Sequence, residues 1–179
     1  MKFAEALFGL DKLSFSVNHK TPVIGRVLFL QEAKNKPVQV RVALVNVPDG
    51  LHGFHVHQKP ITSSILKTNG NCCALLEGHF GGNQPNWSPT NPTGVKHGHH
   101  VGDLCFNLKA KNNRVNYEFI DYKVSLYSSS PNCVLNRSLI LHKDPDDCGL
   151  GTGNKQQESW ITGNAGTRIA CANINAITY

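Results

Sequence analysis

The sequence has no apolar run long enough to form a membrane-spanning helix, so it gives no sign of a membrane partner. The uninterrupted apolar core of a signal peptide is missing as well, because Glu5 breaks it, and we therefore expect a cytoplasmic protein. Basic clusters are also lacking. The 18 lysines and arginines outnumber the 12 acidic residues but are scattered, which argues against nucleic acid as a partner.

Cysteines are few and irregularly spaced. Six in 179 residues are too few for a scaffold held together by disulfides. The sequence contains no C-x-x-C pair, so the cysteines do not predict a zinc site. Charged residues make up 17% of the chain and hydrophobic residues 40%, a balance that favours a globular protein over a disordered one. The length suits one domain.

Glycine and proline are frequent, with 16 and 9 residues, which indicates a loop-rich all-β protein. The clearest strand signal covers residues 38–45, where apolar side chains alternate with others. Further strands are predicted over residues 13–17, 23–30, around 55–57, and over 115–119, 123–127, 138–142 and 169–174. We predict an all-β fold, an eight-stranded antiparallel Greek-key β-sandwich or barrel, as one domain over residues 12–179 that follows an N-terminal extension over residues 1–11.

Two long polar stretches, residues 58–111 and 143–167, separate the predicted strands. Loops this long in a compact domain are usually functional or disordered, and the histidines and Asp103 in the first stretch favour function. Before it, His55 and His57 lie two positions apart on a strand and so point to the same face. Imidazoles held this way suit Cu, Zn, Fe or Ni. A single pair is more often two ordinary surface histidines, but a metal site is favoured by the histidines that follow: His79, His97, His99, His100 and His142.

Five motifs occur in a specific order: L-H-G-F-H-V-H at 51–57, G-H-F at 78–80, H-V-G-D-L at 100–104, H-K-D-P-D-D at 142–147 and G-N-A-G-T-R-I-A-C at 163–171. Over residues 12–177 they make the chain resemble the copper/zinc superoxide dismutases. The resemblance implies an antioxidant enzyme that converts superoxide to dioxygen and hydrogen peroxide by copper redox cycling, with a structural zinc. It also implies a homodimer and allows a copper chaperone as a partner.

The resemblance implies two ligand sets that share one residue. Copper would be held by His55, His57, His79 and His142, and zinc by His79, His97, His100 and Asp103. Four imidazoles serve both oxidation states of copper, whereas three histidines and one aspartate give zinc a closed tetrahedral set.

Other roles follow from the same resemblance. Asp146 would accept hydrogen bonds from ligand imidazoles and orient them. Arg168 would donate hydrogen bonds to the superoxide anion beside copper, and Cys73 would form a disulfide with Cys171. The net charge of +6 and Lys155 would help to attract the anion.

Several alternatives stay open. His99 competes with His97 as a zinc ligand, and Cys72 competes with Cys73 for the disulfide, while Cys105, Cys133 and Cys148 are expected to be free thiols. The loop between His57 and Cys73 is several residues longer than is usual in the family. Because this loop commonly contributes to the dimer interface, a monomer stays the alternative to the homodimer. A noncatalytic copper-delivery protein and a copper-only enzyme are the competing functions, although the full ligand sets disfavour both.

Overall fold

The computed structural model describes residues 1–81 and 100–178, apart from the side chains of residues 105 and 106. In chain order the elements are β1 Lys2–Phe8, β2 Ser14–Ser16, β3 Ile24–Gln31, β4 Val38–Val45, β5 Gly50–His57, α1 Ser63–Leu66, the 3₁₀-helix η1 Cys72–Leu75, β6 Asp103–Ala110, β7 Arg114–Asp121, β8 Ser138–His142, the 3₁₀-helix η2 Gly153–Lys155, α2 Gln156–Thr162 and β9 Arg168–Ile177. Within the described ranges, no helix is long and apolar enough to cross a membrane.

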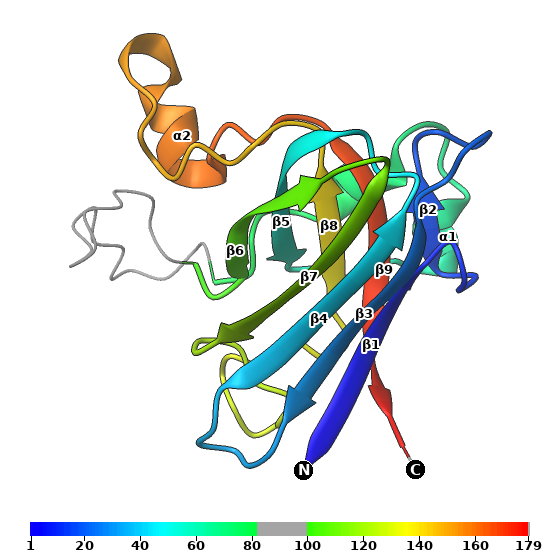
Figure 1. Cartoon of the computed structure of the whole chain (residues 1–179), viewed down its shortest axis with the longest axis vertical. Coiled ribbons are helices and arrows are strands. Elements are labelled where there is room, and N and C mark those ends of the chain that lie inside the picture. The colour runs from blue at the N-terminus through cyan, green and yellow to red at the C-terminus, as the bar shows by residue number, and fades with distance from the viewer. Residues whose placement is uncertain (82–99, 179) are drawn as a thin grey trace.

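Eight strands form an antiparallel sheet in the order β6-β5-β8-β9-β1-β3-β4-β7, and the short β2 pairs with β9. The two ends of this order, β6 and β7, follow one another in the chain. They are joined by a turn at Asn112 and Asn113, whose φ angles are 54° and 56°. Asparagine tolerates this conformation in tight hairpin turns. Because the turn brings the two ends together, the sheet closes into a nearly complete barrel (Figure 1).

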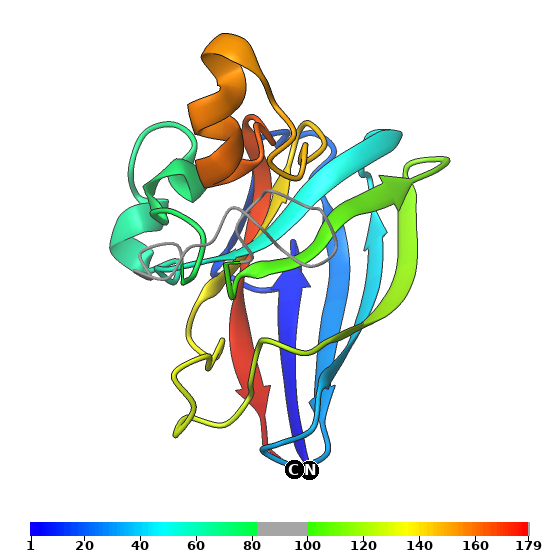
Figure 2. The same cartoon turned by 90° about the vertical axis from the view of Figure 1, so that its left-hand side faces the viewer.

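Alternating burial along the strands fills the interior of the barrel. On β4, Val38, Val40, Val42 and Leu44 are buried, as their alternation predicts. Each such side chain contributes roughly 1.5–3 kcal/mol of burial free energy. The all-β prediction is confirmed. Helix α2 stands at one end of the barrel, and the two termini lie side by side at the other (Figures 1 and 2).

The prediction of an N-terminal extension outside the domain is wrong. β1 lies inside the sheet, between β3 and β9. Its residues Ala4, Ala6 and Phe8 have no exposed surface. Glu5 interrupts the apolar pattern only on the outer face, where it accepts a hydrogen bond from Arg26 at 2.6 Å. The segment therefore alternates like the other strands, but its small alanines make the signal faint.

Three further predictions are corrected. Residues 103–110, assigned to a loop, form β6, in which Leu104, Leu108 and Ala110 are buried. Residues 123–127, predicted as a strand, form an isolated bridge between Ser125 and Cys133 but no named strand. The backbone N–H of Leu126 donates to the side chain of Gln31 at 2.7 Å. The second polar loop contains α2, a helix too short to show a clear period in the sequence.

Candidate metal centre

Four buried histidines converge from separate parts of the barrel. His55 and His57 come from β5, and His142 is the last residue of the neighbouring strand β8. His79 reaches the group through an isolated bridge with His57. One ring nitrogen from each residue lies within 4.8 Å of the others. The structure thus brings together the four residues that the resemblance implies as copper ligands.

Backbone carbonyls determine which nitrogen carries hydrogen in two of these rings. Nδ1 of His57 lies 2.8 Å from the carbonyl oxygen of Glu77, and Nδ1 of His142 lies 3.3 Å from that of Gly166. Because a carbonyl can only accept, each Nδ1 donates, and Nε2 of the neutral ring keeps a lone pair. The two Nε2 atoms lie 3.3 Å apart. They are therefore placed to bind one cation.

The pKa values of His57 and His142 lie well below that of free imidazole. Burial is the main cause in both. The nearby His79 and Arg168 also lower the pKa of His57, and His55 and His79 lower that of His142. Both rings are therefore neutral at pH 7, the state in which imidazole binds a metal.

Asp146 orients the remaining ring of the group. Its carboxylate accepts a hydrogen bond from Nε2 of His55 at 2.8 Å, and both side chains are fully buried. Nδ1 is then the nitrogen that His55 would offer to a metal. Asn107 bonds to both backbone groups of Asp146, at 2.7 and 2.9 Å. Gly163 has φ of 66°, and a Cβ there would lie 2.0 Å from the carboxylate, so this position needs glycine.

A second group consists of His79, His100 and Asp103, whose ligand atoms again lie within 4.8 Å of one another. One carboxylate oxygen of Asp103 lies 2.8 Å from Nδ1 of His79, and the other lies 3.2 Å from Nδ1 of His100. Burial alone would raise the pKa of Asp103, but hydrogen bonds from His100 and His79 outweigh it and hold this pKa well below its usual range. His79 belongs to both groups. The predicted ligand His97 and its rival His99 lie outside the described residues.

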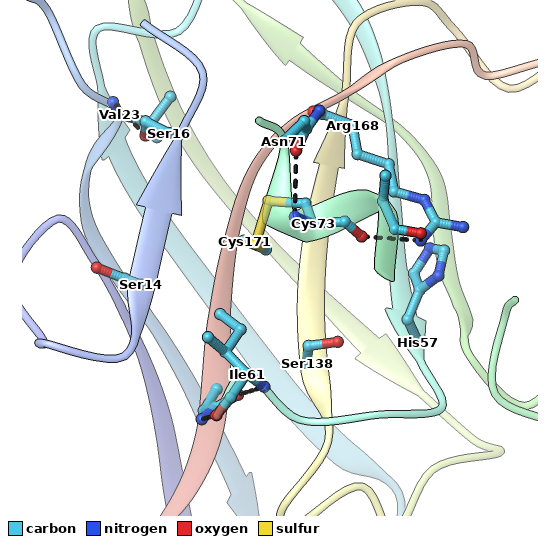
Figure 3. The surroundings of a disulfide bond; sticks show 12 residues. Ser14, Ser16, Val23, His57, Ile61, Asn71, Cys73, Ser138, Arg168 and Cys171 are labelled. Atoms are coloured by element: carbon cyan, nitrogen blue, oxygen red, sulfur yellow. Dashed lines mark hydrogen bonds between the residues drawn. A yellow bond between two sulfur atoms is a disulfide. The ribbon is translucent and has the colours of Figure 1, made fainter. Parts of the chain in front are cut away.

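Arg168, the first residue of β9, is fixed by backbone carbonyls. Its Nη1 donates to the carbonyl oxygens of Cys73 at 2.8 Å and Ala74 at 3.3 Å, and its Nη2 donates to that of Glu77 at 2.6 Å. Figure 3 shows the guanidinium beside the ring of His57. These three hydrogen bonds leave the side chain few accessible rotamers and hold it beside the four-histidine group.

The structure contains the disulfide that the resemblance implies, between Cys73 and Cys171 (Figure 3). Cys72 is a buried free thiol, although its sulfur lies within 4.8 Å of both bonded sulfurs. Cys133 and Cys148 are free thiols, as expected. Burial and the nearby Asp146 and Asp147 raise the pKa of Cys148 to about 11, so it stays protonated.

A cavity of about 590 Å³ lies over both groups. Its lining includes His79, His142 and Arg168, with α2 contributing Glu158 and Ile161. Lys155, which the sequence suggested as an attractor of anions, is not part of the lining in the described chain. Among the described lining residues, Arg168 carries a guanidinium beside which a small anion could bind.

Sequence reasoning missed two residues that support the site. The ring nitrogens of His52 lie 2.9 Å from the carbonyl of His142 and 2.7 Å from that of Pro48, so this ring ties β5 to the end of β8. Glu77 has φ of 62° and aims its carbonyl at both His57 and Arg168. The place of His52 inside the L-H-G-F-H-V-H motif was a usable signal. The sequence gives no signal for Glu77, because its backbone carbonyl, not its side chain, makes these contacts.

The donor chemistry fits two different cations. Four neutral imidazoles form a set suited to copper in both oxidation states. Two imidazoles and a carboxylate supply three of the four ligands that zinc takes in a closed site. The shared ring of His79 would couple the two ions electrostatically.

Comparisons with known proteins agree with this geometry. The family model described as copper/zinc superoxide dismutase (SODC) matches residues 23–174. The superoxide dismutase [Cu-Zn] of Onchocerca volvulus is 35% identical over 155 residues, which cover 83% of this chain and 86% of the relative. That of Paramecium bursaria Chlorella virus 1 is 36% identical over 157 residues, covering 84% and 72%. The crystal structure of the clock protein EA4 matches with a TM-score of 0.69 and 27% identity, covering 98% of this chain and 94% of that one.

Proposed function

This chain belongs to the copper/zinc superoxide dismutase family, and from that premise we propose which of its residues carry the reaction. The protein is an oxidoreductase that converts superoxide to dioxygen and hydrogen peroxide, with copper and zinc as its metals. When bound, copper supplies the one-electron redox chemistry, and zinc supplies a fixed positive charge.

The proposed copper ligands are His55, His57, His79 and His142. The observation that supports this most is the convergence of their buried ring nitrogens, two of which are fixed as lone-pair donors by carbonyls on Nδ1. The ring of His55 is oriented by Asp146 at 2.8 Å. Such partners hold a ligand in place and raise its basicity.

The proposed zinc ligands are His79, His100 and Asp103, with His97 as the fourth, expected from the sequence. Because Nδ1 of His79 faces Asp103, Nε2 is the nitrogen directed to the copper set. His79 is therefore the group that would hold and release a proton at Nε2 during each cycle, next to the substrate.

Arg168 is the proposed binding group for superoxide. Three carbonyl acceptors hold its guanidinium at the cavity that also exposes His79 and His142. A fixed guanidinium offers charge-assisted donors to a small anion and so orients it before electron transfer. Association should be aided by the net charge of +6 and weaken with added salt.

The test combines metal analysis with a superoxide-consumption assay. The copper-loaded wild type should remove superoxide rapidly, and His142→Ala should lose at least about a hundredfold of this rate, because the copper set loses one of its ligands. His19→Ala, at an exposed histidine far from β8 in sequence, is the matched control and should keep the wild-type rate. An inactive wild type with copper bound would contradict the assignment, as would full activity in His142→Ala.

Homodimerisation, delivery of copper by a chaperone and a cytoplasmic location are further proposals from the family. Two exposed apolar side chains support the first: Val17, directly after β2, is 44% exposed, and Leu75, in η1, is 49% exposed. Sedimentation equilibrium tests it. The mass should be twice the chain's 19.6 kDa and should fall to one copy when both residues are changed to aspartate.

A further inference from the structure

Lys123 contacts the second ligand group from the segment that follows β7. Its Nζ donates hydrogen bonds to the backbone carbonyl oxygens of His100 at 2.8 Å and of Asp103 at 2.7 Å. We propose that Lys123 is a positioning residue for the zinc site, and that its ammonium group fixes the turn that presents His100 and Asp103. This inference rests on the proposed assignment of zinc to His79, His100 and Asp103.

The turn over residues 100–103 is closed by its own hydrogen bonds. The backbone N–H of Asp103 donates to the carbonyl of His100 at 3.1 Å, and the N–H of His100 donates to the carboxylate of Asp103 at 3.1 Å. Gly102 connects the turn to the ligand strand, because its carbonyl accepts from the N–H of Val56 at 2.8 Å. Any movement of the turn therefore shifts two proposed ligands together.

Lys123 donates hydrogen bonds to the carbonyl oxygens at both ends of this turn. His100 and Asp103 are 7% and 2% exposed, so water has little access to replace a lost donor there. The carbonyl of His100 would keep the backbone N–H of Asp103 as a donor, but both carbonyls would lose a charged donor, which bonds more strongly than a neutral one. Without Lys123 the turn would relax towards solvent, and the two ligand side chains would separate.

The protein also fixes the position of Lys123 itself. The buried carboxylate of Asp121 accepts the backbone N–H groups of Lys123 at 2.7 Å and Val124 at 2.8 Å. The side chain of Asn132 donates to the carbonyl of Lys123 at 2.9 Å. Burial lowers the pKa of Lys123, whereas the charges of Asp103 and Asp121 raise it. The two carboxylates thus offset a positive charge that lies near a cation site.

The experiment measures zinc affinity in the full chain. Demetallated protein is titrated with Zn²⁺ against a chromophoric chelator, and with Co²⁺ to record the visible absorption of the occupied site. Lys123→Met should weaken zinc binding by about 10–100-fold, the usual effect of losing a group that orients metal ligands. The Co²⁺ bands should also shift. A residue that only stabilised the fold would leave the spectrum of the folded protein unchanged.

Three variants make the result specific. Lys123→Arg keeps the charge and the donors and should recover most of the zinc affinity. Lys109→Met makes the same chemical change at an exposed position of β6 and should bind zinc as the wild type does. Copper affinity should fall less than zinc affinity in Lys123→Met, because the described hydrogen bonds of its ammonium group go to His100 and Asp103, and His79 is the one proposed copper ligand that Asp103 contacts in the described chain.

Two outcomes are kept separate by His100→Ala. If this variant binds zinc as tightly as the wild type, the proposed zinc assignment fails, whatever Lys123 does. If His100→Ala loses zinc but folded Lys123→Met keeps the wild-type affinity and Co²⁺ spectrum, the inference on Lys123 is overturned. Should Lys123→Met not fold by circular dichroism, the same criterion is applied to Lys123→Gln, which retains a neutral donor.

Discussion

The disulfide between Cys73 and Cys171 spans 98 residues of sequence, so its removal should greatly enlarge the conformational freedom of the unfolded chain. In the chain-entropy account a loop of this size corresponds to about 4.7 kcal/mol at 25 °C. We predict that Cys171→Ser lowers the free energy of unfolding of the metal-free protein by about 4–5 kcal/mol. This is a large part of the roughly 5–15 kcal/mol that holds a typical domain folded.

The neighbouring thiol gives a matched control. Cys72→Ser also changes a buried cysteine in η1 but leaves the bridge intact, so its cost should stay near the roughly 1 kcal/mol of an average substitution. Cys73→Ser should cost less than Cys171→Ser, because the sulfur of Cys72 lies within 4.8 Å and can bond to Cys171 instead. The double variant of Cys72 and Cys73 should then match Cys171→Ser.

Urea unfolding followed by circular dichroism measures these differences. A reductant should lower the stability of the wild type to that of Cys171→Ser and leave the variant unchanged. The loop-closure reasoning is refuted if Cys171→Ser and Cys72→Ser lose the same stability, or if Cys171→Ser loses less than about 1 kcal/mol.

Three other predictions concern the site. Arg168→Lys should keep both metals but slow superoxide removal by at least about tenfold, because one ammonium cannot bond to the backbone carbonyls and also present a fork to the anion; an unchanged decay rate would remove the arginine from the proposal. The metal-free protein should become less stable as the pH falls below about 6.5. His57 and His142 have lowered pKa values when folded, so the unfolded chain takes up protons first, at about 1.4 kcal/mol per pH unit for each ring until its folded pKa is reached; equal urea midpoints at pH 7.5 and 5.5 would contradict this. Gly163→Ala should cost about 1–3 kcal/mol, since φ is 66° and the new Cβ would lie 2.0 Å from Asp146; an unchanged melting temperature would count against the tight packing.

The sequence predicted the strands that alternate strongly. Residues 38–45 and 138–142 form β4 and β8 at the predicted bounds, because period-2 burial and runs of branched side chains are local signals. β1 was missed because Ala4 and Ala6 carry little apolar area, although the strand lies in the middle of the sheet. Leu126 looked like a strand residue, but a contact with Gln31, 95 positions away, replaces its ladder bond. Such long-range competition leaves no local pattern.

The candidate site divides in a similar way. Through the family resemblance that they carry, the motifs predicted the set of His55, His57, His79 and His142 that converges in the structure. The spacing could not show how they meet, because β5 and β8 are 80 residues apart in the chain and become neighbours only through the sheet order.

By itself, then, the sequence determined which donor chemistries are present and where the strongest strands run, because both depend on the identity of nearby side chains. The tertiary structure alone decided which ring nitrogen of His57 keeps a lone pair, how Arg168 is held and which groups Lys123 bonds to, since all three depend on backbone carbonyls. Every residue has the same carbonyl group, so no sequence pattern marks the one that a fold turns towards a metal site.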